Sequence, residues 1–229
     1  MNKILLIGCG HMGNALMLSW LKSNKYQLTV IDPKKFNVLD KQYKNKNTNF
    51  LKSISNLNSF SRFDYIILAV KPIDLQNVLK ELTKIKLNKK TSVISVIAGK
   101  KINSISKYLL NIKNIFRVMP NMPASIGQSM NCIVANKKVS KIKKLEISKL
   151  FSYSGRVLFL DNENQIDMAT AISGSGPGFV FNLIDAMEQS AIKLGFKKNV
   201  ANKLVIQTFL GSAELISRNN ISAENLVSM

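Results

Sequence analysis

Hydrophobic residues in the first two thirds of the chain alternate between short unbroken runs and helical spacing. The unbroken runs predict buried strands at residues 3–8, 27–31, 64–70, 92–98 and 114–119. Apolar residues three or four positions apart predict helices at residues 12–23, 75–86 and 102–110. Strands that alternate with helices are typical of a doubly wound α/β fold. We therefore expect a Rossmann-like sheet, whose ligands bind beyond the carboxyl ends of its strands.

The pattern changes at residue 161, after which only helical spacing remains. Phe179, Leu183, Met187 and Leu194 follow one helix, and a second helix is expected at 199–217. The sequence thus predicts a Rossmann-like domain at 1–160 and a smaller all-helical domain at 161–229. Because a region this short buries such apolar helices poorly, we expect it to pair with a second copy, as a homodimer or a higher homo-oligomer.

Two lysine-rich segments have weaker patterns. Residues 34–53 predict a short helix within mobile loops. Residues 139–151 carry apolar residues between lysines, which suits either a helix on a membrane surface or, as we prefer, a packed helix with a solvated face. No apolar run approaches the ~18 residues that span a bilayer, and the first run is too short for a signal peptide. We expect a soluble cytoplasmic protein with no membrane partner.

Composition adds two expectations. The net charge is +20, yet only four of the 33 basic residues are arginine. Proteins that read base sequences rely on arginine forks and stacked aromatic rings. We therefore expect no specific nucleic-acid partner, although the positive field attracts anionic cofactors and substrates. Cys9, Cys132 and the single histidine do not follow a metal-binding spacing, so we expect no metal.

The sequence Gly8-Cys9-Gly10-His11-Met12-Gly13 matches the pattern G-x-G-x-x-G, directly after the first predicted strand and at the start of a helix. In this context the first glycine permits a tight turn and the second lets a pyrophosphate approach the backbone. The third lets the helix pack closely on the strand. The helix N-terminus offers free N–H groups to the phosphates. We expect these six residues to bind a nicotinamide dinucleotide, with His11 serving the phosphate site rather than catalysis.

The end of the second predicted strand bears on the choice of cofactor. Asp32 lies where an acidic residue accepts hydrogen bonds from the adenosine ribose and favours NADH. Lys34 and Lys35 follow at once, and either one suits the 2′-phosphate of NADPH. The sequence therefore predicts NADPH or NADH and does not choose between them.

Two further strand ends are candidate binding loops. Ala69-Val70-Lys71-Pro72 closes one strand, with Lys71 either a ligand or a solvated side chain. The segment 117–123 leaves another strand, and Asn121 lies between two prolines that stiffen the backbone. Its amide suits a nicotinamide contact, and a purely structural turn is the alternative.

The segment 167–177 is rich in small residues and ends at Pro177, where a helix is expected to begin. Small residues permit a close backbone approach, either to a ligand or to a partner helix. The segment lacks the G-x-S-x-G pattern, and the only histidine lies in the glycine loop. We therefore do not expect serine-hydrolase chemistry.

Together these motifs resemble pyrroline-5-carboxylate reductase over residues 3 to about 215. The most diagnostic part is Ser173–Pro177, followed by Gln207-Thr208 and Gly211. The resemblance implies hydride transfer from NADPH or NADH to 1-pyrroline-5-carboxylate, which gives L-proline, and a helical domain that dimerises by intertwining. It also implies Asn56 at the adenosine ribose and Glu163 near the substrate. The matched motifs hold no strong general acid, so we expect Thr170 or solvent to supply the proton.

One departure from the family concerns the C-terminal region. A segment resembling S-P-G-G-T-T, which holds the substrate carboxylate, is expected shortly after Leu226, and the sequence stops at Met229. We expect cofactor binding to survive and turnover to suffer. The alternatives are an impaired dinucleotide-binding protein that self-associates, or another Rossmann imine or hydroxyacid dehydrogenase. β-Hydroxyacid dehydrogenases carry a catalytic lysine on a long helix, where this chain has only Lys193.

Overall fold

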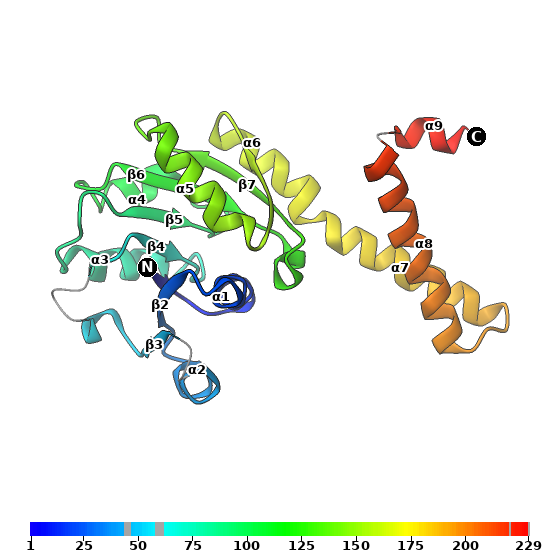
Figure 1. The fold of residues 1–229 in the computed structure, drawn as a ribbon, viewed down its shortest axis with the longest axis horizontal. Coiled ribbons are helices and arrows are strands. Elements are labelled where there is room, and N and C mark those ends of the chain that lie inside the picture. Colours follow the sequence, from blue (N-terminus) through cyan, green and yellow to red (C-terminus); the bar gives the residue numbers. More distant parts are fainter. Residues whose placement is uncertain (44–46, 58–61, 220, 229) are drawn as a thin grey trace. The chain divides into compact units, whose positions relative to one another are not determined.

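The computed structural model describes residues 1–43, 47–57, 62–219 and 221–228 (Figure 1). The chain divides into two compact units, Met1–Ser175 and Gly176–Met229. Each unit is described by itself.

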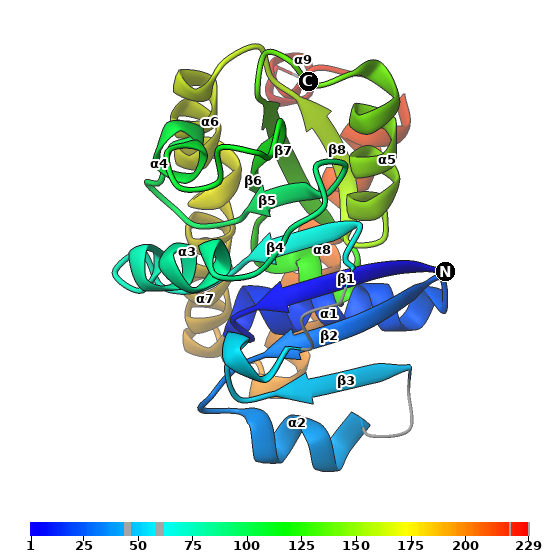
Figure 2. The same cartoon turned by 90° about the vertical axis from the view of Figure 1, so that its left-hand side faces the viewer.

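The first unit is a Rossmann-like doubly wound sheet (Figure 2). Its strand order is β3-β2-β1-β4-β5-β6-β7-β8, and all neighbouring pairs are parallel except β6 and β7. The strands are β1 Asn2–Ile7, β2 Tyr26–Ile31, β3 Thr48–Leu51, β4 Tyr65–Leu68, β5 Ser92–Ser95, β6 Asn114–Met119, β7 Ser129–Ala135 and β8 Gly155–Phe159. Because β1 pairs with β2 on one side and β4 on the other, the chain reverses its winding direction at β1, where such sheets bind ligands.

Helices cover both faces of this sheet. They are α1 His11–Ser23, α2 Phe36–Tyr43, α3 Leu75–Thr83, α4 Ile102–Ser106, α5 Lys141–Ser152 and α6 Glu163–Ala169. Three short helical segments complete the unit: 3-10 helix η1 Ile54–Asn56, 3-10 helix η2 Met122–Ile126 and π-helix η3 Thr170–Gly174.

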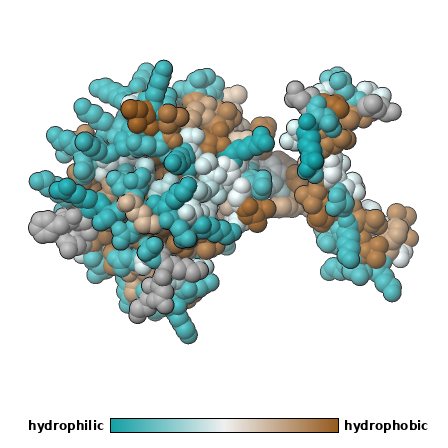
Figure 3. Space-filling model, viewed as in Figure 1, coloured by the Kyte–Doolittle hydropathy of each residue, from teal (hydrophilic) through white to brown (hydrophobic). Residues whose placement is uncertain are grey.

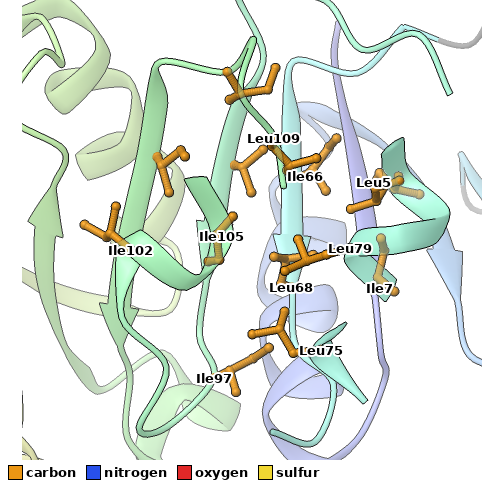
Figure 4. Close-up of a cluster of buried hydrophobic side chains, with 14 of the residues drawn as sticks. Leu5, Ile7, Ile66, Leu68, Leu75, Leu79, Ile97, Ile102, Ile105 and Leu109 are labelled. Atoms are coloured by element: carbon orange, nitrogen blue, oxygen red, sulfur yellow. The ribbon is translucent and has the colours of Figure 1, made fainter. Parts of the chain in front are cut away.

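The two sheet faces bury separate hydrophobic clusters, because successive side chains of a strand point to opposite sides. Leu5 and Ile7 of β1 join the cluster beneath α3 and α4 that Figure 4 shows. Ile4 and Leu6 join the cluster under α1 and α5. There the indole N–H of Trp20 donates to the carbonyl oxygen of Leu150 at 2.9 Å, which ties α1 to α5. The helix that follows the glycine loop is thus held firmly on the sheet.

The two lysine-rich segments both contain regular structure. Residues 36–43 form α2, as expected, but 48–51 form the edge strand β3, which the sequence pattern did not predict; 44–46 lie outside the described residues. Helix α5 packs on the sheet through Ile147, Leu150 and Phe151, whereas Ile142 and Leu145 are exposed.

The compact first unit reaches Ser175, beyond the boundary at residue 160 that periodicity suggested. Ile166 of α6 is fully buried in the α3/α4 cluster, and Ala169 packs against the same cluster. Helix α6 therefore belongs to the sheet unit, although its sequence pattern matches that of the helices that follow.

The second unit consists of α7 Gly176–Lys193, α8 Lys198–Asn219 and α9 Ala223–Val227. Among its described residues only Ala201 and Val205 are buried. Large apolar side chains are exposed along α7 and α8, and Figure 3 shows them as brown patches. Within the described residues, no helix has the length and apolar character needed to cross a membrane.

Candidate functional site

A cleft of about 580 Å³ opens beyond the carboxyl ends of β1, β2 and β4. Its walls come from the glycine loop, the start of the β2–α2 connection, the residues after β3, and the segment from β4 into α3. Several residues predicted to bind the cofactor line it: Gly8, Gly10, Asp32, Lys34, Ala69, Val70 and Lys71. The cleft therefore lies where a doubly wound sheet holds a dinucleotide.

The three glycines of the motif have three different environments. Gly8 has φ +92°, and a Cβ there would lie 2.6 Å from the carbonyl oxygen of Ala69. A Cβ on Gly13 would lie 2.3 Å from the carbonyl oxygen of Gly8, so α1 could not approach the strand as closely. A Cβ on Gly10 would meet no heavy atom within 4 Å, and Gly10 faces the cleft. Gly8 and Gly13 thus permit close backbone packing, whereas Gly10 keeps the backbone accessible to a ligand.

The carboxylate of Asp32 already accepts hydrogen bonds from three backbone N–H groups. Its Oδ2 accepts the N–H of Cys9 at 2.8 Å, and its Oδ1 accepts the N–H groups of Lys34 and Lys35 at 3.0 Å each. The carboxylate therefore ties the glycine loop to the turn after β2. Since each oxygen already has a partner, Asp32 is a poorer acceptor for ribose hydroxyls than the sequence suggested.

The cationic wall beside Asp32 consists of Lys34, Lys35 and Lys52, with Ser53 next to them. All three lysines are exposed. Lys52 and Ser53 follow β3, which pairs in parallel with β2, so the same sheet edge presents them beside the β2 turn. Lys52 and Ser53 have no signal in the sequence pattern, because the pattern does not predict β3.

Asn56 lies at the end of η1 and caps it. Its Oδ1 accepts the backbone N–H of Ser53 at 3.1 Å and the hydroxyl of Ser53 at 2.7 Å. Among the described residues that line the cleft, Ser53 and Ile54 are present and Asn56 is not. The contact between Asn56 and a ribose stays a prediction. In the structure, Asn56 holds the turn at Ser53 through these two hydrogen bonds.

Cys9 is fully buried, and burial raises the pKa of its thiol to about 11, with the nearby Asp32 carboxylate adding to the rise. With a pKa of about 11 rather than 9.0, the thiolate fraction at neutral pH falls about 100-fold. We expect iodoacetamide to modify native Cys9 at least about 100-fold more slowly than the urea-unfolded chain, as followed by mass spectrometry. Fast modification of native Cys9 would contradict this assignment.

Asn121 is held by the sheet and by the π-helix η3. Its Oδ1 accepts the N–H of Met130 at 3.0 Å, and its Nδ2 donates to the carbonyl oxygen of Ser173 at 2.8 Å. These bonds favour the structural alternative for Asn121 over the predicted nicotinamide contact, because its oxygen and its amide nitrogen are both engaged.

Thr170 and Glu163 are likewise bonded within the protein. The hydroxyl of Thr170 donates to the carbonyl oxygen of Ile166 at 2.7 Å. The Oε1 of Glu163 accepts the N–H of Ile102 at 2.8 Å and lies 3.7 Å from Nη1 of Arg117. Arg117 is 1% exposed and also pairs with Asp167 at 2.8 Å. Arg117 was not among the predicted site residues, although a lone arginine within the apolar run 115–119 was the available signal.

Comparison with known proteins places this geometry in context. The family model "Pyrroline-5-carboxylate reductase dimerisation" matches residues 163–229, and the model "NADP oxidoreductase coenzyme F420-dependent" matches residues 3–99. The chain is 31% identical to pyrroline-5-carboxylate reductase of Haemophilus influenzae over 218 residues, which cover 94% of this chain and 79% of the relative. It is 29% identical to the Aquifex aeolicus enzyme of the same name, with 98% and 82% of the two chains covered.

Solved structures are similar over the same length. Pyrroline carboxylate reductase of Plasmodium falciparum, solved with NADP bound, matches with a TM-score of 0.83 and 28% identity and covers 98% of this chain and 82% of its own. The enzyme of Coxiella burnetii matches with a TM-score of 0.85 and 29% identity, covering 98% and 83%. Prephenate dehydrogenase of Aquifex aeolicus, at 15% identity and a TM-score of 0.62, shares the fold.

Proposed function

The chain belongs to the pyrroline-5-carboxylate reductase family, and we propose that it reduces 1-pyrroline-5-carboxylate to L-proline with NADPH. One observation carries the proposal: the glycine-loop cleft at the β1 crossover lies in a chain that aligns with these reductases over nearly its whole length. The same cleft in a chain without that alignment would support only a dinucleotide-binding protein.

The residues of the cleft fit a dinucleotide. Gly10 leaves its backbone open to the cleft, and α1 begins at His11, so the N–H groups of its first turn are available to phosphate oxygens. Lys34, Lys35 and Lys52 favour a cofactor with a further phosphate. We propose that the preferred cofactor is therefore NADPH rather than NADH.

A bound dihydronicotinamide would supply a hydride to the carbon of the C=N bond, while the nitrogen holds a proton, so that one C–H and one N–H bond result. Thr170 is the residue we assign to the imine. Because its own proton is directed to Ile166, its oxygen can accept an N–H bond but is not free to donate one. We therefore propose that the imine is protonated from solvent and that Thr170 orients the protonated form.

The direct test is an assay of the purified chain with the imine and NADPH. We expect loss of NADPH absorbance that depends on both protein and imine, and formation of one proline for each NADPH oxidised, measured by mass spectrometry. Binding of NADPH without any proline would overturn the proposed reaction and leave a dinucleotide-binding protein.

We also propose that the helical unit forms a homodimer through α7 and α8, whose apolar side chains have no cover within the described part of this unit. The match to the dimerisation family model over 163–229 supports this assembly. A surface this apolar is typical of an interface between subunits.

Acidic substitutions on α7 or α8 are expected to dissociate the dimer. Phe179→Asp and Leu210→Asp place a charge at positions that are 69% and 60% exposed. Ile142→Asp on α5, at 70% exposure, is the matched control. In sedimentation velocity we expect the first two variants to shift to monomers and the control to keep the wild-type assembly. A wild-type chain that is monomeric at all concentrations would contradict the proposal.

A further inference from the structure

The segment Glu163–Ser175, which contains α6 and the π-helix η3, is attached to the sheet by two side chains from the region of β6. The first is Arg117, whose guanidinium lies against two carboxylates of α6. Its Nη2 is 2.8 Å from Oδ1 of Asp167, and its Nη1 is 3.7 Å from Oε1 of Glu163. Because Glu163 and Asp167 are four residues apart, they share one face of α6. One buried cation therefore fixes which face of α6 meets the sheet.

Burial of this arginine is costly even though its charge is paired with carboxylates, because desolvation can exceed the Coulombic gain. Arg117 is 1% exposed, and within the described part of the chain its Nε and Nη1 have no hydrogen-bond partner. A hydrophobic residue would fit the rest of this strand, since Ile115, Phe116 and Val118 are fully buried and apolar. The position thus carries a charge at a cost in stability, which points to a role beyond packing.

The second attachment is Asn121, which follows β6 and bonds to the π-helix η3 at Ser173. The π-helix has an identifiable local cause. The hydroxyls of Thr170 and Ser173 donate to the carbonyl oxygens of Ile166 and Ala169, in competition with backbone N–H groups. The N–H of Ser175 then bonds to the carbonyl oxygen of Thr170 at 2.9 Å, five residues back. Such π turns occur frequently at functional sites.

We infer that Arg117 and Asn121 are positioning residues for Thr170. One holds the helix before Thr170, and the other holds the π turn after it, so together they set where the Thr170 hydroxyl lies relative to the sheet. The inference rests on the proposed function, because it is the imine substrate that Thr170 serves. A displacement of about 1 Å at such a group lowers turnover by up to ~100-fold.

The variants are chosen to change one attachment at a time. Asn121→Asp keeps an oxygen for the N–H of Met130 but replaces the donor to Ser173 with a carboxylate. Arg117→Lys keeps the charge but cannot reach both carboxylates with a planar fork. Thr170→Val removes the hydroxyl itself, and Ser125→Ala, at an exposed position of η2, is the control.

We expect Asn121→Asp and Arg117→Lys to lower kcat by about 10- to 100-fold. The dissociation constant for NADPH, measured by fluorescence titration, should stay within about twofold, because neither residue lines the dinucleotide cleft in the described structure. The decisive measurement is a double-mutant cycle. If Asn121 acts through Thr170, Asn121→Asp should lower kcat little further in the Thr170→Val background.

If Asn121→Asp lowered kcat by the same factor in the wild-type and Thr170→Val backgrounds, the inference would be overturned, since Asn121 and Thr170 would then act independently. An unchanged kcat in Asn121→Asp would also overturn it. A wild-type chain that makes no proline would refute the proposed reaction, and amide hydrogen exchange would then decide the positioning. Faster exchange at 170–175 in Asn121→Asp and Arg117→Lys, but not in Ser125→Ala, supports it, and unchanged exchange overturns it.

Discussion

Gly10→Val is expected to weaken dinucleotide binding by about 100- to 10,000-fold while leaving the fold intact. The valine side chain would enter the cleft at the point where the phosphates approach the loop, and it would separate them from the N–H groups of the first turn of α1. Loss of two charge-assisted hydrogen bonds, at about 1.5–3 kcal/mol each, corresponds to this range. The measurement is a titration of NADPH fluorescence.

The fold should tolerate this change because Gly10 has φ −65° and ψ −161°, which suit any residue, and open space at Cβ. Gly13→Val is the informative partner. Its Cβ would lie 2.3 Å from the carbonyl oxygen of Gly8, so α1 must move away from β1, and urea unfolding should show a large loss of stability. If Gly10→Val bound NADPH like the wild type, the phosphates would not lie at this loop.

These glycines illustrate what the sequence could predict. The loop is local: the strand, the turn and the helix that form it are contiguous, so spacing and composition identified it together with β1 and α1. The strands missed by the sequence pattern are those whose position depends on the rest of the sheet. β8 lies at an edge and is nowhere fully buried, and β7 pairs with β6 in the antiparallel direction without a helical crossover.

At the candidate site, too, the features that the sequence could not predict depend on contacts between distant parts of the chain. Sequence spacing selected Asp32 and Asn121 as polar residues after strand ends, and the family resemblance added Glu163, but neither showed which of their atoms were already bonded. Apart from the N–H groups of Lys34 and Lys35 beside Asp32, those bonds come from residues between 9 and 61 positions away, such as Met130 and Ile102. Likewise, Lys52 reaches the cleft only because β3 extends the sheet beside β2.

The second large expected effect concerns the cationic wall of Lys34, Lys35 and Lys52. Replacing both Lys34 and Lys35 with glutamate is expected to lower the affinity for NADPH by about 100-fold or more and to change the affinity for NADH much less. Only NADPH carries the 2′-phosphate, and the double variant removes two cations from it and adds two repelling carboxylates. The backbone N–H groups of both residues, which hold Asp32, remain in place.

The acidic residues of the cleft do not cancel this preference. Asp32 accepts three backbone N–H groups, and Glu81 pairs with Lys84 at 2.6 Å. Asp74 lines the cleft from the β4–α3 side, among residues of a different segment from the lysine wall. The carboxylate nearest the lysines is thus the one most strongly bonded to the protein.

The matched control separates a local contact from the general field of a highly basic protein. Lys41→Glu changes the charge at an exposed position of α2 that does not line the cleft in the described structure. We expect it to leave the ratio of NADPH to NADH affinities within about twofold of wild type, because an exposed charge that makes no direct contact with the cofactor is weakened by salt. Equal losses for NADPH and NADH in the Lys34→Glu/Lys35→Glu variant would contradict the assignment, since a contact with the 2′-phosphate cannot affect a cofactor that lacks it.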